Sequence, residues 1–332
     1  MNDKYYIKEL KKEQWRKWDQ FVMETEYSTP FSNTWFLERI CKIFGGNITI
    51  IAIINKKKDK IVGGVALRSL EFFSYKIAFP SQLLLYMPIL IDKKEVNDRE
   101  VYGLEEKLSA ILKKRFNTIL YLNNTTDFID LRGFKDNKFK LKVGYTAITD
   151  FSYLDFYNVG KSNRKLIKKA ESNGLFIKES SDIDAMWNIW QKTAERQSFK
   201  LKLNKDNFSE LYNVLKEHNC CQGFIVYTQD EKPVSFRISI WNNKSMAFGW
   251  IAGTDPEYFD IGASTYMIWN SLNLLKNKGF VAFDWCGANI KGVANFKMSF
   301  GARIQPYFYI DKYNVLFNIA IKTRKLYKKL CR

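Results

Sequence analysis

The chain has 332 residues, of which 46% are hydrophobic and 16% are aromatic. This composition excludes a disordered chain, and the length favours two domains, each with its own buried core. The 53 Lys and Arg residues outnumber the 35 Asp and Glu residues, which gives a formal charge of +18. Such a charge favours an anionic partner, namely RNA, anionic lipid or a substrate that carries phosphates. A lysine-rich surface without such a partner is the alternative.

Membrane insertion, secretion and metal binding are not indicated by the sequence. It has no uninterrupted apolar run of about eighteen residues, which a membrane-spanning helix needs. Its first residues lack the basic and then apolar pattern of a signal peptide, so we expect a cytoplasmic protein. The five cysteines are an odd number and two of them are adjacent, which favours free thiols. Because no Cys-x-x-Cys pair occurs, we expect no zinc site.

In the first half, hydrophobic periodicity predicts two helices, a hairpin, a strand, a helix and a further strand. The helices are expected at 14–23, 35–43 and 104–114, and the strands at 47–54, 61–68, 72–79 and 118–122.

The second half repeats this order after a helix that Ser162 caps and Gly174 ends. Helices are expected from 184, from 206 and over 263–278, and strands over 223–228, 233–241, 245–252 and 280–285. An apolar strand, a charged turn and a second strand occur in both halves. We therefore predict a mixed α/β protein that arose by duplication of one unit.

Residues 283–302 read Phe-Asp-Trp-Cys-Gly-Ala-Asn-Ile-Lys-Gly-Val-Ala-Asn-Phe-Lys-Met-Ser-Phe-Gly-Ala. This pattern of strand, Asp, glycine turn and Phe-Lys-x-x-Phe-Gly resembles the closing segment of FemAB/FemX-like transferases, which belong to the GNAT acetyltransferase superfamily. The resemblance implies two tandem GNAT-like domains, at 1–150 and 151–313, and the basic residues and helical apolar spacing of 314–332 predict a further helix. It also implies transfer of an aminoacyl or acyl group to an amine of a cell-envelope precursor in peptidoglycan or surface polysaccharide synthesis.

The same segment supplies the predicted catalytic pair, Lys297 and Asp284. Lys297 lies between the apolar residues Val293 and Phe296 and the following Phe300, so we expect its amine in a cleft where both halves of the protein meet. The resemblance implies that Lys297 faces a substrate phosphate or developing charge. We expect Asp284 to accept a proton or to orient the acceptor amine. A solvated lysine and an aspartate that only bonds to the turn are the alternatives.

Four further side chains are predicted to contact substrate by the same resemblance, together with Phe296: Arg196, Arg164, Trp35 and Arg39. Arginine can grip a phosphate through two parallel hydrogen bonds. For Arg196, pairing with Glu195 or a favourable position at a helix C-terminus is the alternative. Trp35 is as well explained by a place in the core.

The donor substrate is left open between aminoacyl-tRNA and acyl-CoA, with no tightly bound cofactor expected. Ordinary GNAT enzymes bind coenzyme A at a glycine loop before a helix, and Gly262, Ala263 and Ser264 occupy the matching place. The cation that leads this loop in such enzymes is missing here.

The acceptor is expected to be an anionic, phosphate-bearing envelope precursor. The tail 314–332 is basic and has apolar residues at helical spacing, so it either binds anionic lipid at the inner face of the membrane or docks on the second domain. Two other functions stay open. One is an acyl-CoA-dependent N-acyltransferase of an amino sugar, and the other is a non-catalytic basic module that binds RNA or membrane.

Overall fold

The computed structural model describes residues 4–313, so the predicted helix at 314–332 lies outside the described residues. The chain forms two compact units. Of the described residues, unit 1 contains 4–25, 31–143 and 307–313, and unit 2 contains 26–30 and 144–306. Within residues 4–313, no helix is long and apolar enough to cross a membrane.

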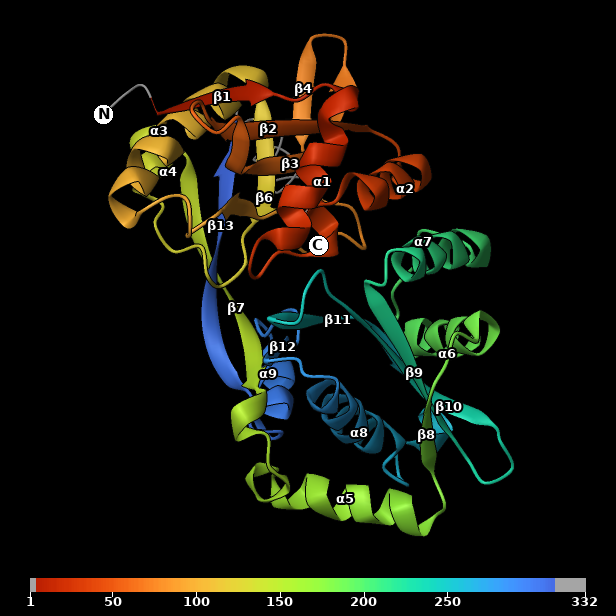
Figure 1. The fold of residues 1–332 in the computed structure, drawn as a ribbon. Helices are drawn as coiled ribbons and strands as arrows, with labels where there is room; N and C mark the ends of the chain where they lie inside the picture. Colours follow the sequence, from red (N-terminus) through yellow and green to blue (C-terminus); the bar gives the residue numbers. More distant parts are fainter. Residues whose placement is uncertain (1–3, 314–332) are drawn as a thin grey trace, which may run out of the picture. The chain divides into compact units, whose positions relative to one another are not determined.

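Unit 1 contains helices on a mixed sheet (Figure 1). Its elements are β1 (Tyr5–Glu9), α1 (Trp15–Glu24), α2 (Thr34–Phe44), β2 (Asn47–Asn55), β3 (Lys60–Phe72), β4 (Tyr75–Ala78), β5 (Ile89–Ile91), α3 (Asp98–Arg115), β6 (Thr118–Asn123) and α4 (Arg132–Asp136). The strand order is β1-β2-β3-β4-β6-β13, and β5 pairs with β3. Most residues of β2 and β3 are buried in continuous runs, which requires cover on both faces of the sheet.

Helix α3 begins six residues before the predicted helix. The side chain of Asn97 accepts hydrogen bonds from the amides of Arg99 and Glu100, and the carboxylate of Glu100 accepts one from the amide of Asn97. This reciprocal cap satisfies free N–H groups in the first turn, and Lys113, Lys114 and Arg115 suit the negative end of the helix dipole. The polar capping residues therefore determine where the helix begins, and the first apolar residue of the periodic pattern does not.

Unit 2 contains most of the second half of the chain. Its elements are α5 (Lys161–Ser172), β8 (Phe176–Glu179), α6 (Ile183–Arg196), α7 (Lys205–Glu217), β9 (Cys221–Tyr227), β10 (Pro233–Ile240), β11 (Met246–Thr254), α8 (Ala263–Asn277), β12 (Ala282–Asp284) and α9 (Lys291–Met298). Two longer strands, β7 (Lys140–Asp150) and β13 (Arg303–Lys312), contain residues of both units.

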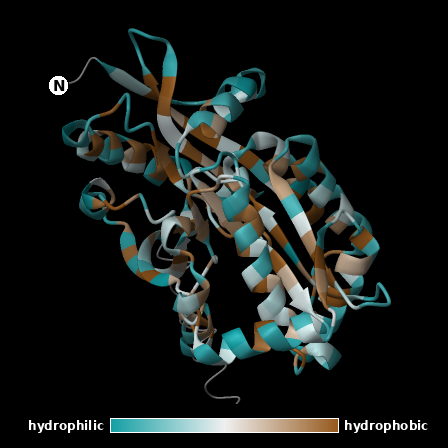
Figure 2. Ribbon diagram, turned by 60° about the horizontal axis from the view of Figure 1, so that its bottom comes forward, coloured by the Kyte–Doolittle hydropathy of each residue, from teal (hydrophilic) through white to brown (hydrophobic). Residues whose placement is uncertain are grey.

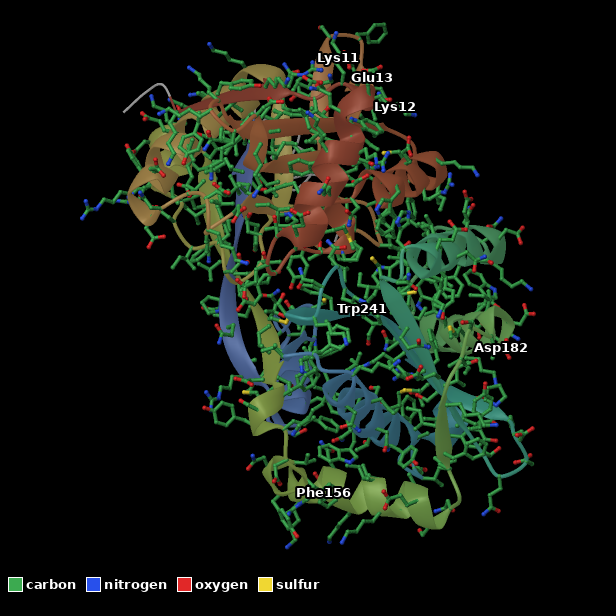
Figure 3. All side chains as sticks on the ribbon, viewed as in Figure 1. Lys11, Lys12, Glu13, Phe156, Asp182 and Trp241 are labelled. Carbon is green, nitrogen blue, oxygen red and sulfur yellow. The ribbon has the colours of Figure 1, made fainter. Side chains whose placement is uncertain are left out.

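The sheet of unit 2 has the order β7-β12-β11-β10-β9-β8. Helices α6 and α7 cover one face, and α5 and α8 cover the other (Figure 1). Asp182 caps the start of α6, where its side chain accepts the amide proton of Ala185 at 2.9 Å (Figure 3). Hydrophobic residues lie along the strands, whereas the helices carry hydrophobic and hydrophilic residues on different sides (Figure 2).

The two units repeat one pattern of strand pairing. In unit 1 the pairs β1–β2, β2–β3 and β3–β4 are antiparallel, β4–β6 is parallel and β6–β13 is antiparallel. In unit 2 the same series runs through β8, β9, β10, β11, β12 and β7. The predicted duplication and the mixed α/β class are confirmed. The last strand of each sheet comes from the other half of the chain, which the periodicity did not predict.

Candidate active site

The candidate site lies in unit 2, where the parallel pair β11–β12 ends. Register pairs join Met246 to Ala282 and Phe248 to Asp284, after which β12 stops and β11 continues to Thr254. Ligands of α/β proteins commonly bind beyond the carboxyl ends of parallel strands, because chain that leaves a strand there is free to form loops. Asp284 is the last residue of β12, so the predicted carboxylate stands at this edge.

Lys297 reaches back from α9 to the turn that follows β12. The side chain is buried, with 9% of its surface exposed. Its ammonium donates a hydrogen bond of 2.8 Å to the main-chain oxygen of Trp285 and a second to the main-chain oxygen of Gly287. Burial lowers the pKa of Lys297, and Arg237 adds to this lowering, whereas Cys286 and Asp284 oppose it. The lysine is thus held in the protein and is not a solvated surface residue.

The neighbours that bury Lys297 differ from those predicted. Val293 and Phe296 are each 39% exposed, so neither encloses the amine as core residues would. Phe300 is buried just beyond α9, and its ring lies 5.8 Å from the indole of Trp285. Helical geometry explains the exposure of Phe296, because adjacent residues on a helix point about 100° apart, but it does not explain that of Val293, which is four residues before Lys297.

Asp284 is buried and holds the turn at 285–287. Its carboxylate accepts hydrogen bonds from the hydroxyl of Thr146 at 2.5 Å and from the amide of Cys286 at 2.7 Å. The Thr146 hydroxyl oxygen in turn accepts the amide proton of Gly287 at 3.0 Å. Cys286 has a φ of 55° and Gly287 a φ of 103°, so this left-handed backbone needs such local support. Asp284 therefore helps to present the two carbonyl groups that bind Lys297.

Cys286 lies between these groups, and its surroundings disfavour the thiolate form. Burial raises the pKa of its thiol well above the usual value, and Asp284 raises it further, while Lys297 and Arg237 oppose the shift. Only the thiolate form of cysteine is strongly nucleophilic. The chemistry of this site must therefore come from the lysine, the carboxylate and the main chain.

Arg237 is a member of this cluster that the sequence analysis did not select. It lies in the middle of β10 with 6% of its surface exposed. The guanidinium carbon lies 5.0 Å from the centre of the Phe283 ring and 5.1 Å from that of Trp285. Burial lowers the pKa of Arg237 to about 10, so it stays charged at neutral pH. A lone charged residue in a strand whose other residues are apolar or serine was the signal that could have identified it.

The other predicted substrate contacts in unit 2 are not joined to Lys297. Arg196 is exposed at the end of α6, with its guanidinium 4.8 Å from the centre of the Phe259 ring. Arg164 is half-buried on α5. Among the described residues, no hydrogen bond or ion pair connects either arginine to Lys297. Phosphate binding by these arginines stays a prediction.

Trp35 and Arg39 belong to unit 1, on helix α2. Both are half-buried, and the Trp35 ring meets the ring of buried Phe36 edge-on at 6.2 Å. The predicted contact of these two side chains with an acceptor sugar likewise stays a prediction.

The segment Gly262–Ser264 begins helix α8, as the sequence predicted. Gly262 has a φ of 86° and caps the helix. A Cβ at this glycine would lie 2.4 Å from the main-chain oxygen of Leu166, so α5 lies directly against the first turn of α8. That carbonyl oxygen carries a partial negative charge, which disfavours an anion on this side of the helix end. Coenzyme A binding at the loop stays a prediction.

Comparison with known proteins agrees with this fold. A sequence profile of the acetyltransferase (GNAT) domain matches residues 157–298, which include Asp284 and Lys297. Among solved structures, FemX is similar with a TM-score of 0.67 and 15% identity, over 91% of this chain and 97% of FemX. Among curated proteins, none matches this chain.

Two further structures are similar over most of their length. One is the C-terminal domain of a protein from Agrobacterium fabrum described as a lysylphosphatidylglycerol synthetase, with a TM-score of 0.59 and 12% identity over 95% of this chain and 96% of that domain. The other is a tandem GNAT protein from the clavulanic acid biosynthesis pathway, with a TM-score of 0.52 and 9% identity over 92% and 97%. At these identities the likeness is one of fold.

Proposed function

We propose that this chain, which contains a GNAT domain at residues 157–298 and has a fold similar to that of FemX, transfers an aminoacyl or acyl group to an amine of a nucleotide- or lipid-linked cell-envelope precursor. The GNAT domain makes it an acyl or aminoacyl transferase. The tandem GNAT-like fold expected from the sequence is confirmed. A described activity of one structural neighbour, synthesis of lysylphosphatidylglycerol, supports an envelope component as acceptor.

The observation that carries this proposal is the buried ammonium of Lys297 at the end of β12. Attack of an amine on an ester or thioester carbonyl puts a negative charge on the carbonyl oxygen. When the adduct collapses, the bond to the leaving group breaks, the nitrogen loses a proton and the leaving oxygen or sulfur gains one. A fixed positive charge in a water-poor site stabilises that oxyanion strongly. The ammonium has three N–H groups, of which two bind carbonyl oxygens, so the third is available to substrate.

Asp284 serves this site as a positioning residue. Its bonds to Thr146 and Cys286 fix the turn, and the carbonyl groups of the turn fix Lys297. A buried carboxylate near the ammonium also favours the charged form of the lysine. As a second role, we propose that Asp284 accepts the proton that the attacking amine loses. The pH dependence of transfer would reveal this role.

The positive charge of the chain suits either donor and a phosphate-bearing acceptor. Aminoacyl-tRNA is a polyanion, and nucleotide-linked sugars carry a diphosphate. We favour action in the cytoplasm, where both donors are produced, with the acceptor reached in solution or at the inner face of the membrane. An acyl-CoA-dependent N-acyltransferase of an amino sugar is the second candidate, supported by the match to an acetyltransferase domain.

The proposal is tested with the purified chain, the two donors and a panel of amino-sugar nucleotides and peptide-bearing envelope precursors. Mass spectrometry of the acceptors should show addition of one aminoacyl or acyl group. Ribonuclease treatment abolishes the reaction if charged tRNA is the donor and leaves it unchanged if acyl-CoA is. Specific binding of RNA or lipid vesicles without modification of any acceptor would favour a non-catalytic basic module.

A further inference from the structure

Arg237 is a buried cation without a partner in the part of the chain that the structure describes. Its Nη1 atom is inaccessible to solvent and makes no hydrogen bond. No ion pair or hydrogen bond of any other atom of this guanidinium is found among residues 4–313, and its contacts are with the rings of Phe283 and Trp285. A buried donor without an acceptor costs free energy, and a buried charge costs more, so this arrangement requires an explanation.

Ser239 presents a second unpartnered group on the same face of β10. The pairing of β10 with β9 runs without a break from Ser235 to Ile240, so side chains two residues apart point to one side. Ser235 bonds to Gly253 and Thr254 on that side, whereas the hydroxyl of Ser239 is buried without an acceptor or donor. Two adjacent polar side chains of the strand thus lack partners within the described chain.

The charges around Arg237 do not balance. Arg237 and Lys297 are within electrostatic range of each other, because the arginine contributes to lowering the pKa of the lysine. Cys286 is a neutral thiol, and Asp284 supplies at most one negative charge, which already accepts two hydrogen bonds. With Lys297 protonated, the buried cluster has one more positive than negative charge, which one monoanion would neutralise.

We propose that Arg237, assisted by Ser239, binds a singly charged oxyanion of a substrate beside Lys297. Aromatic rings that lie against a guanidinium leave its N–H groups as the part that can bind an anion. The edge formed by these N–H groups matches the two oxygens of a carboxylate or a phosphodiester. The inference adds a substrate contact to the proposed function. It rests on that function only for the identity of the molecule that carries the anion. A peptide carboxylate and a phosphodiester are the two sources in an envelope precursor or a charged tRNA.

The test uses the full chain and two small probes, sodium acetate for a carboxylate and sodium dimethyl phosphate for a phosphodiester. The unfolding temperature is measured against probe concentration, with sodium chloride at equal ionic strength as reference. The variants are R237M, which removes the charge, and R237K, which keeps the charge but loses the planar edge. R303M is the matched control, because Arg303 is exposed and its guanidinium also lies 5.0 Å from an aromatic ring, that of Tyr153.

We expect one probe to raise the unfolding temperature of the wild type by about 2–5 °C in a saturable manner. R303M should respond equally, R237K should need at least about fivefold more probe, and R237M should not respond. Without probe, R237M should unfold at an equal or higher temperature than the wild type, because it removes an unpaired buried charge. If R237M folds poorly, R237K carries the comparison.

Two results overturn the inference. One is the lack of a saturable response in the wild type, and the other is a response that R237M and R237K share with it. Because the readout is binding and not transfer, it separates this inference from the proposed function. Anion binding at Arg237 in a protein that modifies no acceptor would leave the inference intact and remove the transferase proposal.

Discussion

The ammonium of Lys297 lies 2.8 Å from the main-chain oxygen of Trp285, whose indole also lies against the guanidinium of Arg237. The indole N–H donates to the hydroxyl of Thr149 at 2.9 Å, which fixes the ring. Trp285, the residue directly after β12, thus orients two buried cations. Its carbonyl group binds Lys297, and its ring lies against Arg237. The position of both charges depends on the turn that Asp284 and Thr146 hold.

Removal of the Thr146 hydroxyl should loosen this turn. T146V keeps the side-chain volume but deprives Asp284 of a donor and the Gly287 amide of its acceptor. We expect a loss of about 2–3 kcal/mol in the free energy of unfolding, measured by urea denaturation. S152A is the control, because the exposed Ser152 hydroxyl also donates to an aspartate, at 2.6 Å, and its loss should cost less than about 0.5 kcal/mol. Equal effects of the two variants would contradict the role given to Thr146.

Gly262 should tolerate no side chain. Its φ of 86° is unfavourable for other residues, and a Cβ would lie 2.4 Å from the Leu166 oxygen. We expect G262A to lose about 2 kcal/mol or more of stability. Gly292 on α9 is the matched control, because a Cβ there meets nothing within 4 Å, and G292A should change stability by about 0.5 kcal/mol at most. Calorimetric unfolding of both variants measures the difference, and a neutral G262A would show that α5 moves away easily.

Glu105 in unit 1 should make stability depend on pH. Burial and, to a lesser degree, the charge of Asp130 raise the pKa of this carboxyl to about 8, and its Oε1 atom has no partner among the described residues. The unfolded chain releases this proton near the usual pKa of 4.5, whereas the folded protein keeps it up to about pH 8. The folded state therefore binds the extra proton between these values, and stability contributed by this group falls as pH rises through that window.

The variant E105Q tests this sign. It should be more stable than the wild type by about 2–4 kcal/mol at pH 8.5, and the difference should vanish near pH 4.5. E106Q, at the exposed neighbouring residue, should follow the wild type at both pH values. Urea unfolding at the two pH values provides the comparison, and an E105Q curve parallel to the wild type would refute the raised pKa.

Local pattern predicted most helices and hairpins of this chain. The apolar segments 47–54 and 61–68 flank a charged turn, and they correspond to strands β2 and β3. The exchange of β7 and β13 between the halves was not predicted, because strand pairing over more than a hundred residues leaves no trace in local periodicity. A strand that pairs with a distant partner looks the same in sequence as one that pairs nearby.

Within the site, the motif places Lys297 and Asp284 at one junction of strand and helix, and both side chains bond to the turn between them, while their catalytic roles stay predictions. The reason given for the burial of Lys297 was wrong, since Val293 and Phe296 are each 39% exposed. Arg237 was missed because it is 60 residues from Lys297 in sequence, and only the sheet brings the two charges together. Whether buried charges neutralise one another depends on which residues the fold brings together, and the order of residues in the sequence does not reveal this.

The most direct measurement of the central claim is the transfer rate of K297M beside that of K291M. Both lysines lie on α9, but Lys291 is exposed whereas Lys297 is buried and bonded to the turn. Loss of an electrostatic contact to the oxyanion should lower kcat/KM of K297M by about 100-fold or more, while K291M stays within about twofold of the wild type. A folded K297M that transfers the group at the wild-type rate would contradict the account.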